Sequence, residues 1–297
     1  MKKITVFTPT YNRAYVLDKC YKSLKRQTVK DFIWLIIDDG STDNTKEIVS
    51  KWIKENSIEI IYKYQSNQGM HGAHNTAYKF INTELNVCID SDDYMPNDAI
   101  EKILNFWEKN KSDKIAGIAG LDAFSNGKII GDSFPKGVKT STLFDLHYYY
   151  KIKGDKKLVY RTDLTKEYPY PIFKGEKYVS LAYKYTMIDR KYELALMNEI
   201  LCIVEYMQDG SSLNMLQQYI KNPKGFSFLR ISNLKNPKAK LGFKFKQCIH
   251  YVSTSIISKN FNFVIESPEK LLTILAIPFG VILYMYIIIK TSNKTLN

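Results

Sequence analysis

The sequence predicts an α/β fold in which a mostly parallel sheet carries helices on both faces. Over roughly the first 120 residues, short apolar runs alternate with longer amphipathic runs. Repeated strand–helix units of this kind build parallel sheets, because each helix crosses the sheet before the next strand begins. Polar and acidic segments follow several of the apolar runs directly. Ligand sites in such sheets lie beyond the carboxyl ends of the strands, so these segments are where a site is expected.

Each expected element follows from its local pattern of apolar residues. The expected strands, in chain order, are 4–7, 32–37, 58–64, 86–89 and 115–119. The expected helices are 16–26, 43–54, one that ends near residue 81, and 96–109. Residues 41–43 all suit the N-cap of the second helix, and Pro96 suits the first turn of the fourth. Residues 122–205 are less regular. They are expected to complete the sheet and to build the side of the site that binds a second substrate, the acceptor.

The chain is expected to divide into three parts. Residues 1–220 form the α/β domain, 221–248 form a basic linker with Pro and Gly breakers, and 249–297 form a helical tail that associates with a membrane. Within the tail, Leu271 to Ile289 carry no charge over roughly 19 residues, close to the length of a bilayer span. A hairpin with 249–265 in one leaflet, and a helix that docks a protein partner, remain alternatives.

Composition narrows the classes of partner. The formal net charge of +13 favours a polyanionic partner. No zinc-finger spacing or RNA-binding aromatic signature is present, so we expect no nucleic-acid partner and favour an anionic membrane surface. Four scattered cysteines offer no disulfide framework or zinc site. The amino terminus lacks the pattern of a signal peptide, so the expected location is the cytoplasmic face of the cell membrane.

The most informative segment is Cys88-Ile89-Asp90-Ser91-Asp92-Asp93, where an apolar strand runs into three acids. Clustered carboxylates repel one another unless a cation is bound. Mg²⁺ and Mn²⁺ prefer oxygen ligands and complete their shells with substrate phosphates. The segment therefore predicts a metal at Asp92 and Asp90, with Asp90 also near a ribose and Ser91 a further contact of the nucleotide ligand. The alternative is an acidic turn that caps the next helix.

Two further segments follow the first two expected strands. In Asp38-Asp39-Gly40-Ser41-Thr42-Asp43, Asp39 can bond the N3–H of a uracil-like base or a ribose hydroxyl, and Gly40 permits a tight turn. In the loop after the first strand, Thr8 and Pro9 can form a wall for the base, and Arg13 can reach a phosphate. Tyr11 lies between Pro9 and Arg13 in the sequence and is also expected to contact the nucleotide ligand. Read alone, both segments are also compatible with plain strand-to-helix loops.

The fourth segment, Asn67-Gln68-Gly69-Met70-His71-Gly72-Ala73-His74-Asn75, is a glycine-containing loop that opens a helix. A helix N-terminus favours anionic groups such as a diphosphate. The expected donor contacts here are Asn67, Gly69, His71 and Asn75. His71 and His74 are equally compatible with solvated or capping side chains.

In this order the four segments resemble the inverting family 2 of glycosyltransferases with the GT-A fold, a Rossmann-like fold. The resemblance is specific over residues 3–119 and weaker to about residue 212. It implies transfer with inversion from a UDP- or dTDP-sugar, Mg²⁺ or Mn²⁺ at Asp90 and Asp92, and base contacts from Pro9 and Asp39. It also implies a saccharide or lipid-linked saccharide acceptor in bacterial surface polysaccharide synthesis. Residues 205–212 resemble a late family segment that closes over the donor diphosphate.

The chain departs from the family pattern where the catalytic base is expected. Many relatives carry an acidic pair there, whereas this chain has Gly175-Glu176-Lys177. We expect Glu176 to be the base, with Asp93 the next candidate. Two other functions remain open. One is sugar transfer to polyprenyl phosphate, and the other is a non-catalytic protein that binds nucleotide sugars.

Overall fold

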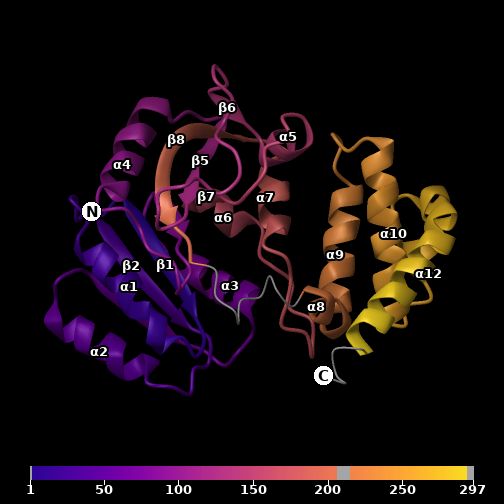
Figure 1. Ribbon diagram of the computed structural model, residues 1–297, viewed down its shortest axis with the longest axis horizontal. Coiled ribbons are helices and arrows are strands. Elements are labelled where there is room, and N and C mark those ends of the chain that lie inside the picture. Colours follow the sequence, from indigo (N-terminus) through magenta and orange to yellow (C-terminus); the bar gives the residue numbers. More distant parts are fainter. Residues whose placement is uncertain (1, 206–214, 293–297) are drawn as a thin grey trace. The chain divides into compact units, whose positions relative to one another are not determined.

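The computed structural model describes residues 2–205 and 215–292 (Figure 1). Their Cα positions divide into two compact units. Unit 1 contains residues 2–169 and 187–205, and unit 2 contains residues 170–186 and 215–292. Unit 1 holds the whole sheet, and unit 2 holds the described helices after residue 214.

Unit 1 is built on one eight-stranded sheet with the order β3-β2-β1-β4-β7-β5-β8-β6. The strands are β1 (Ile4–Thr10), β2 (Phe32–Asp38), β3 (Ile60–Tyr64), β4 (Leu85–Cys88), β5 (Ile115–Ala123), β6 (Thr140–Ser141), β7 (Lys156–Arg161) and β8 (Glu193–Ile203). The pairings give β1 to β5 and β8 a common direction, whereas β6 and β7 run against their neighbours. The predicted mostly parallel α/β sheet is confirmed.

Strand β1 lies at the centre of the parallel part, with β2 on one side and β4 on the other. All seven of its residues are buried, as expected for a strand that is covered on both faces. Because β2 and β4 both run parallel to it, the loops that follow these three strands emerge at one edge of the sheet. The sequence placed its acidic and polar segments in these loops.

Helices cover both faces of this sheet. In unit 1 they are α1 (Ala14–Lys25), α2 (Thr45–Glu55), α3 (Met70–Phe80), α4 (Ala99–Asn110), α5 (Leu143–Tyr148) and α6 (Thr162–Glu167). Helix α7 (Ala182–Ile188) leads back from unit 2 into β8. Buried residues of α1, α2 and α4 share one core with the sheet, whereas the rings of His74 and Tyr78 on α3 pack edge-on against Phe7 of β1.

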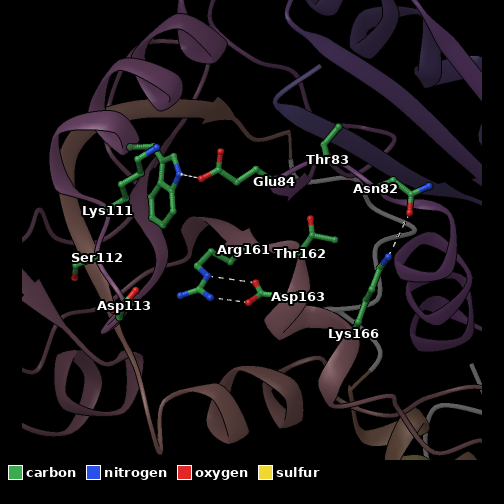
Figure 2. Close-up of a pocket in the computed structure, with 11 residues that line it drawn as sticks. Asn82, Thr83, Glu84, Lys111, Ser112, Asp113, Arg161, Thr162, Asp163 and Lys166 are labelled. Atoms are coloured by element: carbon green, nitrogen blue, oxygen red, sulfur yellow. Dashed lines mark hydrogen bonds and ion pairs between the residues drawn. The ribbon is translucent and has the colours of Figure 1, made fainter. Parts of the chain in front are cut away.

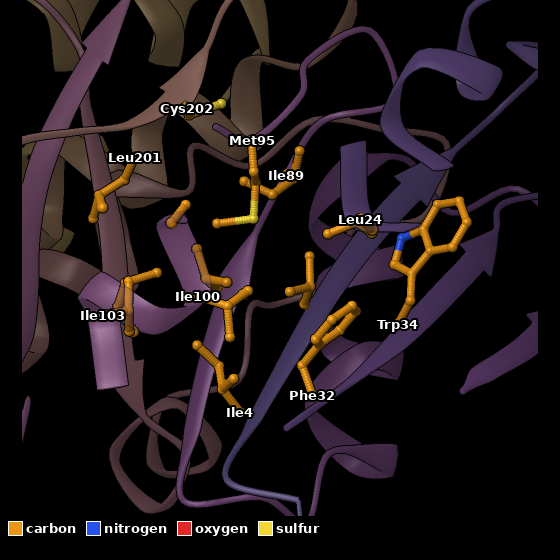
Figure 3. Packing of buried hydrophobic residues seen from close by; sticks show 14 of the residues in the cluster. Ile4, Leu24, Phe32, Trp34, Ile89, Met95, Ile100, Ile103, Leu201 and Cys202 are labelled. Atoms are coloured by element: carbon orange, nitrogen blue, oxygen red, sulfur yellow. The ribbon is translucent and has the colours of Figure 1, made fainter. Parts of the chain in front are cut away.

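The main core lies between the sheet and helices α1, α2 and α4 (Figure 3). Alternate residues of β1 and β2, among them Ile4, Phe32 and Trp34, point into it, as the period of two in a strand requires. At one end of this core Tyr21, Trp34 and Trp52 stack on one another, with ring centroids 4.4 to 6.0 Å apart. This stack joins α1, β2 and α2.

Most boundaries differ from the predictions by a few residues, and the starts of two helices differ for a reason that the contacts show. Helix α4 begins at Ala99, so Pro96 lies in the preceding turn, where its carbonyl accepts a bond from the side chain of Gln27. Helix α2 begins at Thr45, and Asp43 is not its N-cap. The Asp43 carboxylate instead accepts backbone N–H groups from Ala14 and Thr45, which joins the starts of two helices.

Unit 2 is helical over the range that was expected to be a linker. Its helices are α8 (Met215–Lys221), α9 (Pro223–Leu234), α10 (Leu241–Ile257), α11 (Phe263–Glu266) and α12 (Lys270–Ser292). The linker prediction for 221–248 is therefore wrong. Pro223 is the first residue of α9, where its missing N–H breaks no helical bond, and Pro237 lies in the turn before α10. Helix α12 is long and apolar enough to cross a membrane, by length and composition.

Candidate functional site

The loops after β1, β2 and β4 are bonded to one another at the carboxyl edge of the sheet. The amide of Asp39 donates to the carbonyl of Thr10 at 2.8 Å, and the amide of Ile89 donates to the carbonyl of Phe7 at 3.0 Å. The side chain of Asn12 accepts the amide of Thr42 at 2.7 Å. Three of the four segments singled out in the sequence are thereby brought together.

Asp39 joins the fourth segment to this group. Its buried carboxylate accepts the side-chain amide of Gln65 at 2.6 Å and the backbone amides of Gln68 and Gly69 at 2.9 and 2.8 Å. These bonds fix the loop that opens α3. Bonds from backbone N–H groups to a carboxylate are stronger than neutral ones. Asp39 therefore fixes the loops of the candidate site, and the contact with a nucleotide that the sequence predicts for it stays a prediction.

Gly40 is required where the loops after β2 and β3 approach. Its φ of 90° lies in the region that favours glycine, and a Cβ there would stand 2.9 Å from the backbone nitrogen of Asn67. Gly69, at the start of α3, has a φ of 80°. The two glycines let the backbone of both loops come close to the same region.

Several polar atoms near this junction are buried and have no hydrogen-bond partner among the described residues. They are Thr10 Oγ1, Asn67 Oδ1 and both ring nitrogens of His71. Buried polar atoms are normally bonded, so such a group marks a place where a ligand can complete the bonding. Burial lowers the pKa of His71 to about 4, so its ring is neutral at pH 7. A neutral imidazole can bond a phosphate or hydroxyl through one N–H but brings no positive charge.

The residues predicted from the loop after β1 take different places. The Thr8 hydroxyl accepts the indole N–H of Trp34 at 2.9 Å and is fully buried on the core side, so it does not line the edge. Pro9 is buried in β1, and Tyr11 is exposed. The guanidinium of Arg13 donates to the hydroxyl of Tyr15 at 2.9 Å. The prediction that Thr8 forms a wall for the base is wrong, because β1 is covered on both faces.

The acidic segment follows β4 as predicted. Asp90 and Asp92 are half-buried, and Ser91 and Asp93 are buried. The thiol of Cys88 lies 3.8 Å from Asp90 Oδ1 and 3.7 Å from Nε2 of His74, so α3 reaches the base of the acidic segment. His74 is itself held between Phe7 and Tyr78, and Asn75 is half-buried one residue further on. His74 is thus a packed core residue behind the site.

Asp93 differs electrostatically from its neighbours. Burial, with the charges of Asp90 and Asp92, raises the pKa of Asp93 to about 7, although Lys157 opposes the shift. Its carboxylate accepts the backbone amide of Glu205 at 3.2 Å, which joins it to the end of β8. A carboxyl whose pKa is near 7 can hold or release a proton at neutral pH.

Lys157 is a site residue that sequence reasoning missed. It lies on β7, which pairs with β4, and its ammonium donates to the carbonyl of Cys88 at 3.4 Å. Burial would lower the pKa of Lys157, yet Cys202, Asp122, Asp93 and Asp90 together raise it well above its usual value. The acidic segment is therefore partly neutralised by a cation from a strand that no local pattern had placed beside it.

Glu176 lies in unit 2. One carboxylate oxygen accepts the backbone amide of Lys224 at 3.0 Å and the other accepts that of Gly225 at 2.9 Å. These two amides lie in the first turn of α9 and have no partner within the helix. A carboxylate there also interacts favourably with the positive end of the helix dipole. Glu176 is therefore a capping residue in this structure, a role that its sequence neighbours do not reveal.

The acidic segment can be tested for its fit to a divalent cation. Within residues 2–205 and 215–292, no group of three or more His, Cys, Asp or Glu side chains is arranged around one point. Two half-buried carboxylates at Asp90 and Asp92 fit the habit of Mg²⁺, which takes one or two carboxylates and completes its shell with water and phosphate. Residues 206–212 of the predicted diphosphate-closing segment lie outside the described residues.

A hollow of about 830 Å³ lies at the opposite edge of the sheet, before β4 and β5 and after β7 (Figure 2). Its charged side chains are largely engaged already. Arg161 donates twice to Asp163 at 3.2 and 2.6 Å, Glu84 accepts the indole N–H of Trp107 at 2.6 Å, and Lys166 contacts Asn82 at 3.5 Å. None of the residues that line this hollow belongs to the four segments described above.

Comparison with known sequences identifies the family of this chain. The model of a family described as glycosyl transferase family 2 matches residues 5–157. The poly(ribitol-phosphate) beta-glucosyltransferase of Bacillus spizizenii is 33% identical over 125 residues, which are 40% of this chain and 20% of that protein. The poly(ribitol-phosphate) beta-N-acetylglucosaminyltransferase TarP of Staphylococcus aureus is 33% identical over 142 residues, 46% of this chain and 41% of TarP. The chain thus spans well under half the length of these curated relatives.

Solved structures share the fold. S. aureus TarS 1–349 in complex with UDP-GlcNAc has a TM-score of 0.63 at 20% identity, over 92% of this chain and 79% of that one. The mannosyltransferase PcManGT of Pyrobaculum calidifontis, in complex with GDP-Man and Mn²⁺, has a TM-score of 0.56 at 16% identity, over 94% and 73%. At these identities the likeness establishes the fold alone.

Proposed function

The chain belongs to glycosyl transferase family 2, and we propose that it moves a sugar from a nucleotide diphosphate donor to an acceptor hydroxyl with inversion. The observation that carries the proposal is the junction at the carboxyl edge of the sheet. There the acidic segment Asp90–Asp93 follows β4, and Asp39 holds the loop that opens α3. Buried polar atoms of Thr10, Asn67 and His71 have no hydrogen-bond partner among the described residues, so a ligand can bond to them. We propose bacterial surface polysaccharide synthesis as the setting, because the curated relatives include poly(ribitol-phosphate) glycosyltransferases.

We propose a UDP-sugar as the donor, with a dTDP-sugar as the alternative. Asp39 and the loop it fixes, Asn67 to His71, would hold the nucleoside and the diphosphate. Asp92 and Asp90 would hold Mg²⁺ or Mn²⁺, which supplies Lewis-acid stabilisation of the leaving diphosphate when bound. TarS and PcManGT, the solved neighbours, are described with UDP-GlcNAc and with GDP-Man and Mn²⁺. In this chain Lys157 adds a fixed positive charge behind the same carboxylates.

For the base that takes the proton of the acceptor hydroxyl, we propose Asp93 ahead of Glu176. Both oxygens of Glu176 accept backbone amides of α9, whereas Asp93 lies in the loop after β4, next in the chain to Asp92. The proton is removed as the hydroxyl attacks the anomeric carbon from the face opposite the diphosphate. A single displacement of this kind inverts the configuration.

A second candidate function is binding of a nucleotide sugar without transfer. It is favoured by the engaged state of Glu176 and by Lys177 at the position where many relatives carry the second acid. Release of UDP from UDP-sugar, with and without an acceptor, separates the two functions. Transfer to polyprenyl phosphate would appear in the same assay as sugar that enters a lipid fraction.

The test of the proposed function is donor binding and turnover with Asp92→Asn. This change keeps the volume but removes the charge, so UDP affinity in Mn²⁺ should fall about tenfold or more, and turnover should be nearly lost. Asp98→Asn, at the half-exposed start of α4, is the matched control and should leave both unchanged. Wild-type turnover by Asp92→Asn in a buffer without chelator would contradict the metal assignment.

We also propose that the enzyme works at the cytoplasmic face of the cell membrane, next to lipid-linked or polymeric acceptors. The length and apolar composition of α12 support this location.

A further inference from the structure

Helix α12 has one side packed on the other helices of unit 2. Its buried residues are Thr273, Ala276, Gly280, Ile287 and Thr291, whose spacing places them on one helical face. Along most of its length α12 contacts α10. The Thr273 hydroxyl lies 3.5 Å from the thiol of Cys248, and a Cβ on Gly280 would stand 2.5 Å from Val252. Near its end, Ile287 shares a cluster with Tyr219 of α8 and Phe226 of α9. Figure 1 shows α10 and α12 side by side.

The opposite face of α12 is apolar and open to solvent. Its exposed residues are Leu271, Ile274, Leu275, Phe279, Ile282, Met285, Tyr286 and Ile289. Leu275, Ile282 and Ile289 follow one another at intervals of seven residues and are 64%, 65% and 60% exposed. Lys270 and Lys290 are the charged residues of the helix, and both lie at its ends. A continuous apolar surface of this size marks an interaction site.

The positive charge of the helices around α12 indicates which kind of partner its exposed face binds. Residues 215–292 carry eleven Lys and Arg residues against two Glu residues, so most of the net charge of +13 lies in this part of the chain. Basic residues beside an apolar helix face are complementary to anionic lipid, whose surface potential attracts Lys and Arg. A protein partner would have to match both a wide apolar stripe and this excess of positive charge.

We infer that α12 lies in the plane of an anionic membrane, with its exposed face in one leaflet, and does not span the bilayer. This inference rests on the proposed membrane location. From Thr273 to Ile287 the other side of the helix is occupied by α8, α9 and α10. A span would carry these helices into the hydrocarbon, together with Arg230 of α9 and the exposed Lys246 of α10. Charged side chains at that depth are strongly disfavoured.

The depth of the helix can be measured on the full chain with nitroxide labels. Leu275→Cys, Ile282→Cys and Ile289→Cys are labelled one at a time and bound to vesicles of phosphatidylglycerol and phosphatidylcholine. Labelling of the unsubstituted chain, whose four cysteines are buried or half-buried, gives the background. A helix in the plane places all three labels at one depth. Seven residues rise about 10 Å, so a span would put Ile282 deepest and the outer two near the surfaces, which would overturn the inference.

Binding itself is tested by vesicle flotation with one charge added to the face. Ile282→Glu should reduce the bound fraction about tenfold or more, because a carboxylate would enter the hydrocarbon. Ile53→Glu, at a 42% exposed position of α2, is the matched control and should float like the unsubstituted chain. Unchanged circular dichroism confirms that both variants fold.

The outcomes separate the two proposals. If the unsubstituted chain does not float, the membrane location and the in-plane geometry both fall. If it floats but the three labels differ in depth, only the geometry falls. A dimer that Ile282→Glu dissociates, without flotation of either protein, assigns the face to a second copy and overturns the inference.

Discussion

Glu176 offers a direct test of the difference between a capping carboxylate and a catalytic base. Glu176→Ala removes both acceptors of the Lys224 and Gly225 amides at the start of α9. Loss of a helix cap costs about 0.5–2 kcal/mol, and loss of the favourable interaction with the helix dipole adds about 0.3–1 kcal/mol. We therefore expect the free energy of unfolding of unit 2 to fall by about 1–3 kcal/mol. Glu176→Gln keeps one acceptor oxygen and should cost less.

The measurement is urea-induced unfolding of the full chain, followed by far-ultraviolet circular dichroism. With a slope of about 2 kcal/mol per molar urea, Glu176→Ala should lower the midpoint of the transition that involves unit 2 by about 0.5–1.5 M. Glu59→Gln, at an exposed position beside β3, is the control and should leave the midpoint unchanged. Turnover and UDP affinity of the same variants are measured below the transition.

Two results would refute this reasoning. An unchanged midpoint for Glu176→Ala would show that the two hydrogen bonds do not stabilise α9. A loss of turnover of about a hundredfold or more in Glu176→Gln, with midpoint and UDP affinity unchanged, would identify Glu176 as the base, since general-base catalysis contributes that much. The preference for Asp93 would then be wrong.

Three further predictions concern the carboxyl edge of the sheet. Asp39→Ala should weaken UDP binding about tenfold with or without metal, because the loop at Gln68 and Gly69 loses its acceptor; unchanged calorimetric affinity would count against this. Gly40→Ala should lower the melting temperature more than Gly137→Ala, since both have positive φ but only the Gly40 position also meets backbone; equal shifts would show that the close approach is not limiting. In chelator, the Asp93 pKa of about 7 exceeds its unfolded value near 3.8, so the stability that its proton provides is present below pH 4 and lost as pH rises to about 7. Lys157→Met removes the cation that lowers this pKa, so in pH-dependent unfolding the loss should extend to higher pH than in the unsubstituted chain; coincident curves would contradict the role of Lys157.

The first half of the fold was predictable because its signals are local. Apolar runs such as the one in β2 are buried on both faces, and the polar residues directly after them lie at the strand ends whatever the details of packing. Asp90, Asp92 and Asp39 could therefore be placed at one edge from their positions in the chain. Strand β7 could not, because its insertion between β4 and β5 depends on pairing between distant residues. Lys157 was missed for that reason.

Other features that the sequence did not reveal also depend on contacts between residues that are distant in sequence. Glu176 meets the amide of Lys224 across 48 positions, and no pattern around Gly175 indicates that helix start. Thr8 could face the site or the core, and only the indole of Trp34 decides it. The region 221–248 has breakers at Pro223 and Pro237. Pro223 is the first residue of α9, and Pro237 lies in the turn between α9 and α10, so neither interrupts a helix.

The tryptophans, two of which belong to the aromatic stack of the main core, have a spectroscopic consequence. The chain contains three tryptophans, and all of them, Trp34, Trp52 and Trp107, are buried in unit 1. Unit 2 has tyrosines and phenylalanines but no indole. Emission excited selectively from tryptophan therefore reports the opening of unit 1 alone, whereas circular dichroism reports both units. If the two signals change at different urea concentrations, the difference between their midpoints measures how far unit 2 unfolds independently of unit 1.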